Sequence, residues 1–240
     1  MGKICYTRPV SQGLRSRPKT AVRRQARGVR TRGAILRRAF DLASAEGLEG
    51  LTVGRLAYEL GMSKSGLFAH FGSKEELQLA TVETARQIFI DHISRPAMAA
   101  PKGMPRLWSL IDRWLAYFER RVVEGGCFFT AASFEFDSRR GPVRDRIAEI
   151  MREWIGVLVR AVEQAQKAGH IGASVDATSL AFEIQSMAMG GHWASQLLDD
   201  RRSYSRTRAA MVDRLRRIAT PECPPLPSAT GRKRITSKLG

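Results

Sequence analysis

The stretch of residues 31–79 constrains the fold most, because residues that start helices alternate along it with residues that end them. Thr52 and Ser63 carry side-chain oxygens that cap helix N-termini, and Gly61 and Gly72 stand where glycine ends a helix or forms a turn. The pattern predicts helices over residues 31–46, 53–60 and 64–70 and a long helix from Lys74. The second and third have the spacing of a helix-turn-helix, which places one helix in the major groove of DNA.

The rest of the chain is also expected to be helical. Its segments are bounded by glycine and proline, and no alternating β-branched run is long enough for a strand. Arg95-Pro96 and residues 101–105 are expected to break the chain. We therefore predict an all-α fold of about nine helices, with further helices over residues 74–94, 105–123, 127–136, 143–167, 176–198 and 204–219.

Positive charge is concentrated in two tails. The net charge is +17, and residues 1–38 contain twelve lysines or arginines and no acid. Residues 39–220 are nearly neutral, with 24 basic and 22 acidic residues. We expect a disordered basic leader over residues 1–28 and a disordered basic tail over residues 221–240. Such tails bind polyanions, and nucleic acid is favoured over a membrane because no apolar face accompanies the charge; a leader that is merely solvated is the alternative.

Several classes of protein are disfavoured by what the sequence lacks. It has no glycine-rich phosphate loop, metal-ligand cluster or nucleophile–base pair at a recognisable spacing, so we expect no enzyme, cofactor or metal site. No run of 18 apolar residues indicates a membrane span. The three cysteines are far apart and have no disulfide-like spacing, which fits a reducing cytoplasm (Cys5, Cys127 and Cys223).

Residues 31–80 resemble the DNA-binding domain of the tetracycline-repressor (TetR) family of bacterial transcription regulators. The matching residues are Ile35, Ala39, Phe40, Gly47, Thr52, Val53, Leu56, Ala57, Gly61, Met62, Ser63, the run Gly66–Phe71 and the run Ser73–Leu77. The resemblance implies a DNA-binding domain at 29–89, with its helix-turn-helix at 52–71, and a helical ligand-binding and dimerisation domain at 90–220. It also implies a homodimer that binds a palindromic operator and a small-molecule effector that is not yet known.

The first turn of the expected recognition helix carries the candidates for base contact. Ser63, Lys64, Ser65 and Gly66 occupy this turn, where a major-groove reader places its contacting residues. Lys64 can donate to guanine O6 and N7, and the serines can reach bases or phosphates. Ser63 also has a purely structural explanation as a helix cap.

Other residues are expected to contact phosphates without reading sequence. The resemblance assigns this role to Thr52, His70 and Lys74, and the basic leader adds Arg30 and Arg32 as neighbouring candidates. The chain departs from the family at Phe68, where a tyrosine that supplies a hydroxyl to the DNA backbone is usual. One phosphate contact is therefore expected to be missing or replaced by the leader, which can enter the minor groove.

The resemblance implies that the C-terminal part dimerises, through residues 176–198 and 204–219, and encloses a small-molecule pocket. The aromatic residues of this part indicate an apolar or aromatic ligand. Aromatic residues at helical spacing are also typical of a plain core, and that reading stays open for each pocket candidate. The pocket candidates are Trp108, Trp114, Phe118, Phe134, Trp154, Phe182 and Trp193, with Phe128, Phe129 and Met187 beside them and Arg113, Glu135, Gln185 and His192 as polar anchors.

The leading hypothesis is a ligand-responsive dimeric repressor that its effector releases from the operator. The alternative is a non-specific or architectural DNA-binding protein driven by its basic tails. The sequence does not distinguish activator from repressor and does not identify the operator, the effector or the regulated genes.

Overall fold

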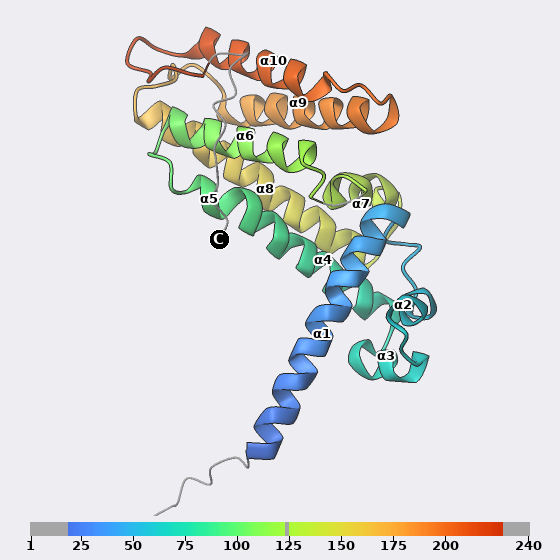
Figure 1. The fold of residues 1–240 in the computed structure, drawn as a ribbon. Coiled ribbons are helices and arrows are strands. Elements are labelled where there is room, and N and C mark those ends of the chain that lie inside the picture. The colour runs from blue at the N-terminus through green and yellow to red at the C-terminus, as the bar shows by residue number, and fades with distance from the viewer. Residues whose placement is uncertain (1–18, 123–124, 228–240) are drawn as a thin grey trace, which may run out of the picture.

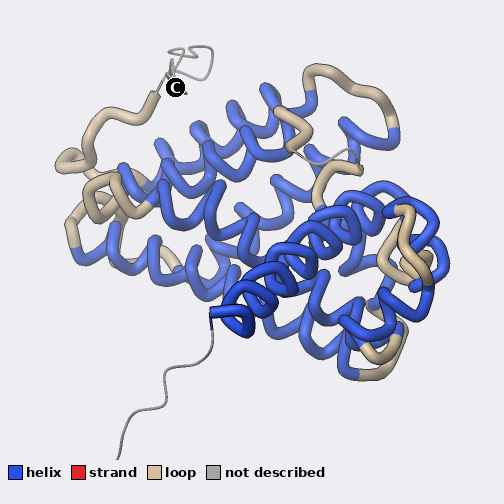
Figure 2. The backbone as a smooth tube through the Cα atoms, turned by 60° about the horizontal axis from the view of Figure 1, so that its bottom comes forward, coloured by secondary structure: helices blue, strands red, loops and turns tan. Residues whose placement is uncertain are grey.

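The computed structural model describes residues 19–122 and 125–227, which are almost entirely helical (Figures 1 and 2). The π-helical segment η1 joins α4 to α5 without interruption, so the described residues form nine separate helical rods. This confirms the all-α fold. The elements are α1 (Lys19–Glu46), α2 (Val53–Leu60), α3 (Lys64–Phe71), α4 (Lys74–Phe89), η1 (Ile90–Ser94), α5 (Arg95–Ala97), α6 (Met104–Glu119), α7 (Phe128–Phe136), α8 (Pro142–Lys167), α9 (Ala177–Leu197) and α10 (Ser203–Ile218).

Helix α4 connects the two ends of the molecule. It packs against α1 near the helix-turn-helix and against α8 in the C-terminal part. Helices α9 and α10 lie side by side at the end of the fold opposite α2 and α3 (Figure 1). The buried residues form one continuous cluster that runs from α1 to α10. Within the described ranges, no helix is both long and apolar enough to cross a membrane.

Helix α1 begins at Lys19 rather than at Thr31, so residues 19–28 are helical and the expectation of a disordered leader is wrong for them. Most residues of this segment are lysine, arginine, alanine or glutamine, which favour helix, and the single glycine is tolerated. The rest of the expected leader, residues 1–18, lies outside the described residues.

The expected break at Arg95-Pro96 is also wrong, because the chain remains helical to Ala97. Pro96 lies in the first turn of α5, directly after the wide π-helical turn, where a missing N–H is best tolerated. The tail is partly ordered as well. Cys223 and Leu226 pack against the core, whereas residues 228–240 lie outside the described part.

Candidate nucleic-acid interface

The two helices of the helix-turn-helix begin at side-chain caps. Thr52 Oγ1 accepts a hydrogen bond from the Arg55 N–H at 3.1 Å, and Ser63 Oγ accepts one from the Gly66 N–H at 3.1 Å. Gly61 forms the turn with φ +59°, a left-handed conformation that favours glycine. A Cβ at Gly61 would meet no atom within 4 Å, so conformation rather than a close helix crossing explains this glycine.

The recognition helix α3 is held by its apolar face. Leu67 and Phe71 of α3 are buried together with Leu56 of α2, and Leu60 packs against them while partly exposed. This side of α3 therefore belongs to the core, and the opposite side faces solvent.

The exposed side of α3 brings the predicted base-contact residues together. Ser63, Lys64 and Ser65 are exposed, and the Oγ atoms of the two serines are 3.3 Å apart. Gly66, in the same turn, is half-buried. The sequence from Gly61 to Gly72 contains no acidic residue, so no carboxylate of this segment repels a phosphate.

Arg32 is a structural residue as well as a basic one. Its Nη1 donates to the main-chain carbonyl of His70 at 3.0 Å, and its guanidinium lies 4.4 Å from the ring centroid of Phe71. These contacts tie α1 to the C-terminal end of α3. Arg32 thus orients the recognition helix, while Arg30 of the same helix is exposed.

Lys74 begins α4 and is half-exposed. Its Nζ lies 2.8 Å from the Glu49 carboxylate in the α1–α2 loop, and this hydrogen bond lowers the pKa of Glu49. An exposed ion pair of this kind is worth about 0–1 kcal/mol, so a phosphate can compete for the lysine. The ion pair with Glu49 therefore does not prevent Lys74 from making the expected contact with a phosphate.

Two features of this end of the fold were not predicted from the sequence: the exposure of Tyr58 and a basic loop before α8. Tyr58 of α2 is 82% exposed, and Phe68 of α3 is 47% exposed, which leaves two aromatic rings at the surface of the helix-turn-helix. The helical wheel could have indicated Tyr58, because its neighbours Leu56 and Ala57 form the buried side.

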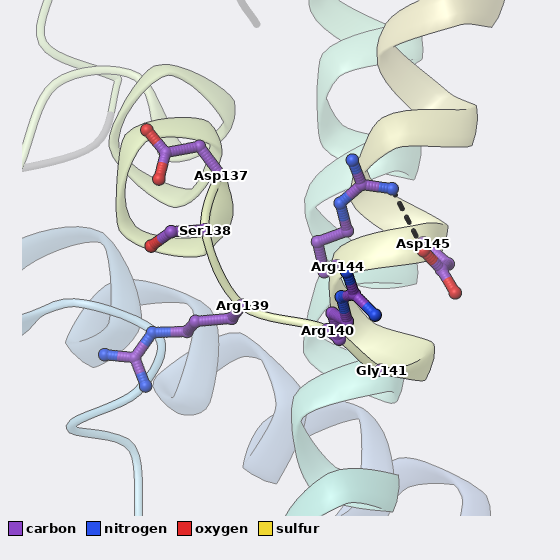
Figure 3. Close-up of a pocket in the computed structure, with 7 residues that line it drawn as sticks. All are labelled: Asp137, Ser138, Arg139, Arg140, Gly141, Arg144 and Asp145. Carbon is purple, nitrogen blue, oxygen red and sulfur yellow. Dashed lines mark hydrogen bonds and ion pairs between the residues drawn. The ribbon is translucent and has the colours of Figure 1, made fainter.

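The second missed feature is a basic loop between α7 and α8 (Figure 3). It lines a hollow of about 370 Å³, and Arg144 bonds to Asp145 at 3.1 Å. Arg139 points away from them toward the N-terminal helices, where it lies 3.7 Å from Glu49. Glu75, in the first turn of α4, helps to line the adjoining hollow, so this loop lies beside the start of α4.

Glu135 joins α7 to the DNA-binding end. Its two carboxylate oxygens accept hydrogen bonds from the backbone N–H groups of Leu48, at 2.8 Å, and Glu49, at 2.9 Å. A Cβ at Gly47, which has φ +90°, would lie 2.8 Å from the same carboxylate. Glu135 was expected as a ligand anchor, which is wrong in this structure because its carboxylate faces the α1–α2 loop.

An aromatic cavity of about 30 Å³ lies inside the C-terminal part. Its walls include Trp114 of α6, Trp154 of α8 and Phe129 of α7, and Trp154 Nε1 donates to Gln185 Oε1 at 3.2 Å. Ligand sites usually have volumes of about 300–1,000 Å³, so a ligand needs the surrounding helices to move apart.

The other pocket candidates lie elsewhere. Phe118 is buried against His192, with ring centroids 4.3 Å apart, and Trp108 packs partly exposed against the core. Phe134, Phe182 and Trp193 are exposed by 63%, 70% and 53%, so their rings lie at the surface and not in the aromatic cavity. Helical spacing alone could not separate these outward rings from inward ones.

His192 is a buried core residue rather than a ligand anchor. Its Nε2 accepts a hydrogen bond from the Cys127 N–H at 3.3 Å, so Nδ1 carries the proton and donates to the Tyr204 hydroxyl at 2.9 Å. Burial lowers the pKa of His192 to about 4, which keeps the ring neutral. Arg113, another expected anchor, bonds to Ser109 on its own helix. No group of three potential metal ligands occurs in the part of the chain that the structure describes.

Helix α9 has an exposed stripe. Phe182, Ser186, Gly190, Trp193 and Leu197 recur at intervals of three or four residues and are all exposed. A Cβ at Gly190 would meet nothing within 4 Å, so the stripe is open to a partner there. Such a stripe of apolar and small side chains is typical of a helix that packs against another chain.

Two family models match the chain. Residues 35–81 match the model described as bacterial regulatory proteins, tetR family, and residues 103–211 match the tetracyclin repressor-like C-terminal domain. Among solved structures, the fold is similar to a TetR transcriptional regulator from Chloroflexus aurantiacus. That match has a TM-score of 0.75 and 22% identity, and it covers 81% of this chain and 98% of the other.

Curated relatives match over shorter regions. The nucleoid occlusion factor SlmA of Vibrio vulnificus is 27% identical over 134 residues, which cover 54% of this chain and 64% of SlmA. The HTH-type transcriptional regulator TcmR of Streptomyces glaucescens is 34% identical over 88 residues, which cover 36% of this chain and 39% of TcmR. The match thus spans less than two thirds of either relative. Together with the helix-turn-helix geometry, the two family models establish that the chain belongs to the TetR family of DNA-binding transcriptional regulators.

Proposed function

We propose that this protein is a dimeric repressor that binds a palindromic operator and is released from it by a small apolar or aromatic molecule. The observation that carries the proposal is the first turn of α3, which is exposed, free of acidic residues and fixed from behind by the core. We assign DNA binding to a unit of residues 29–89 and effector binding and dimerisation to residues 90–220. We also propose that the protein is located in the bacterial cytoplasm and associates with the nucleoid when it is bound to its operator.

In this proposal Lys64 reads a base, with Ser63, Ser65 and Gly66 close enough to contribute. Thr52, His70, Lys74 and Arg30 position the protein on phosphates. The N-terminus of α2, next to Thr52, adds free backbone N–H groups that attract phosphate. Arg32 acts indirectly, because its contact with the His70 carbonyl sets the angle of α3.

The dimer is proposed to form through α9 and α10. Support comes from the exposed stripe on α9, where Phe182 and Trp193 remain accessible in the isolated subunit. A two-fold axis would place the same stripe of each subunit against its mate and build a four-helix bundle. Trp193→Asp is expected to give monomers in sedimentation velocity, whereas the matched variant Phe134→Asp, on α7, should remain dimeric. The opposite result would place the interface elsewhere.

The effector is proposed to enter at the aromatic cavity. Its expansion would move α7, because Phe129 and Thr130 of this helix line the cavity. Glu135, on the same helix, holds the α1–α2 loop. Effector binding and operator binding are therefore coupled through α7, and the coupling is reciprocal: bound operator weakens effector binding by the same factor.

The first test is selection of bound sequences from a random duplex pool at physiological salt. A palindrome with half-sites about one helical turn apart is the expected result. Tight but salt-sensitive binding with no recovered motif would refute the proposal and indicate non-specific association driven by the basic tails.

Two variants then separate base reading from positioning. Lys64→Arg is expected to change the preferred base at one position of each half-site. Lys74→Ala is expected to weaken all sequences equally and to lower the salt dependence by about one unit of slope. Lys102→Ala, which changes an exposed lysine between α5 and α6, is the matched control and should bind like the parent. Identical behaviour of the Lys64 and Lys74 variants would contradict the assigned roles.

A further inference from the structure

A groove of about 330 Å³ opens where η1, α6 and α8 meet, away from the aromatic cavity and from the helix-turn-helix. In Figure 1 this region lies around α5, far from α2 and α3. No residue lines both the groove and the aromatic cavity. We call it the arginine groove; it is lined by Ile90, Ser94, Arg95, Met98, Arg106, Leu110, Val157, Arg160, Ala161 and Gln164.

The lining of the arginine groove is largely apolar. Ile90, Leu110, Val157 and Ala161 come from three different elements, and Met98 is 44% exposed beside them. A large apolar side chain at the surface costs free energy unless something covers it. The groove therefore favours a ligand with an apolar chain.

Three arginines contribute the positive charge of this groove. The Arg106 guanidinium donates to the Ala100 carbonyl at 2.9 and 3.1 Å, which fixes its position. Arg95 pairs with Asp91, whereas Arg160 is exposed and forms no ion pair with any residue that the structure describes. The groove therefore has a net positive charge, because its three arginines outnumber the single aspartate that pairs with them. Guanidinium groups bind carboxylates through paired hydrogen bonds.

Two further features distinguish the arginine groove from an ordinary surface depression. The Oε1 atom of Gln164 is buried and has no hydrogen-bond partner; as an acceptor it needs a donor such as a water molecule, which the carboxylate of the ligand cannot supply. The groove also borders the π-helical turn from Ile90 to Ser94, and such turns are frequent at functional sites because they distort the regular helix.

From this combination we propose that the arginine groove is a second small-molecule site, specific for an amphipathic monoanion with an apolar chain that ends in a carboxylate. The chain lies along Ile90, Met98 and Val157, and the carboxylate meets Arg160 and Arg106. The site is separate from the aromatic cavity, so the inference does not depend on the effector proposed for that cavity.

Isothermal titration of the full-length protein with decanoate, below the concentration at which decanoate aggregates, tests the proposal. Saturable binding of one decanoate per subunit is expected, with decanol weaker by at least about tenfold because it lacks the charge. Arg160→Gln is expected to weaken decanoate binding by about tenfold as well. Arg152→Gln, an exposed arginine on the same helix, is the matched control and should bind like the parent.

Three results would overturn the proposal: no saturable binding, equal binding of decanol and decanoate, or equal affinity of the Arg160 and Arg152 variants. An Ile150→Phe variant identifies the site, because Ile150 lines the aromatic cavity and does not line the arginine groove. The Ile150→Phe variant should still bind decanoate. If it did not bind decanoate although its circular dichroism spectrum was native, decanoate would bind in the aromatic cavity instead. DNA is absent from the titration, so a negative result leaves the proposed repressor function untouched.

Discussion

Replacing Glu135 by alanine should weaken the connection between α7 and the DNA-binding end. The carboxylate accepts two backbone N–H groups, at 2.8 and 2.9 Å. A hydrogen bond to a charged group contributes about 1.5–3 kcal/mol, and the lower value applies here because these bonds are only partly buried. Water can partly replace the lost acceptor, so we expect the free energy of unfolding to fall by about 2 kcal/mol. Glu135→Gln keeps one acceptor oxygen and should lose about half as much.

Urea denaturation followed by circular dichroism measures this loss. Asp137→Asn is the matched control, because Asp137 is an exposed carboxylate two residues further along the chain. The same variants should be titrated with operator DNA, once it is identified, with and without effector. Glu135→Ala should show a smaller effect of effector on operator affinity. If Glu135→Ala were no less stable than Asp137→Asn and fully responsive to effector, the assigned role of Glu135 would be wrong.

Three further predictions concern contacts in other parts of the fold. Arg32→Gln should lower the free energy of unfolding, measured in urea, by about 1–2 kcal/mol. It should also weaken operator binding without altering base preference, because the contacts of Arg32 orient α3. Gly191→Ala should destabilise by about 1–2 kcal/mol in thermal unfolding, because the new Cβ would lie 2.0 Å from Thr207 Oγ1. Gly33→Ala on α1 is the control and should not destabilise, because its Cβ would meet no atom within 4 Å. The pKa of His192 falls from 6.5 to about 4 on folding. The contribution of His192 to the free energy of unfolding should therefore be complete above pH 6.5 and decline by at most about 1.4 kcal/mol per pH unit toward pH 4. Denaturation of His192→Gln at several pH values should show a smaller decline.

Local signals predicted the helices well. The caps at Thr52 and Ser63 form the expected hydrogen bonds, and α2 has the predicted bounds of residues 53–60. Such caps act within one turn, so the residues that form them are visible in a short stretch of sequence. The same holds for the exposed first turn of α3, which follows directly from its cap and its buried side.

Contacts between distant residues could not be predicted in this way. Glu135 and Leu48 are 87 positions apart, and Arg32 and His70 are 38 apart. Neither pairing leaves a periodic pattern, because each depends on where the helices pack. The aromatic residues show the same limit: Trp154 faces inward and Phe182 outward, although both stand in long helices of the C-terminal part. The roles of the predicted DNA-contact residues remain predictions until an operator is available.

Helix α1 is long, so a small tilt moves its N-terminal end further than the rest of the helix. At about 1.5 Å per residue, its 28 residues form a rod of about 42 Å. One end is anchored, because the backbone at Ser44 approaches Gly125 so closely that a Cβ there would lie 1.5 Å from the Ser44 carbonyl oxygen. The other end extends beyond the remaining helices (Figure 1). Arg32 and the residues after it are held against α3 and the core, so the free segment is residues 19–31, which is about 20 Å long. A tilt of about 10° at Arg32 would displace the far end of this segment by about 3.4 Å, comparable with the rise of one base pair along one strand. A small change in the direction of α1 where it leaves the core is therefore magnified at the arginine-bearing end of the helix.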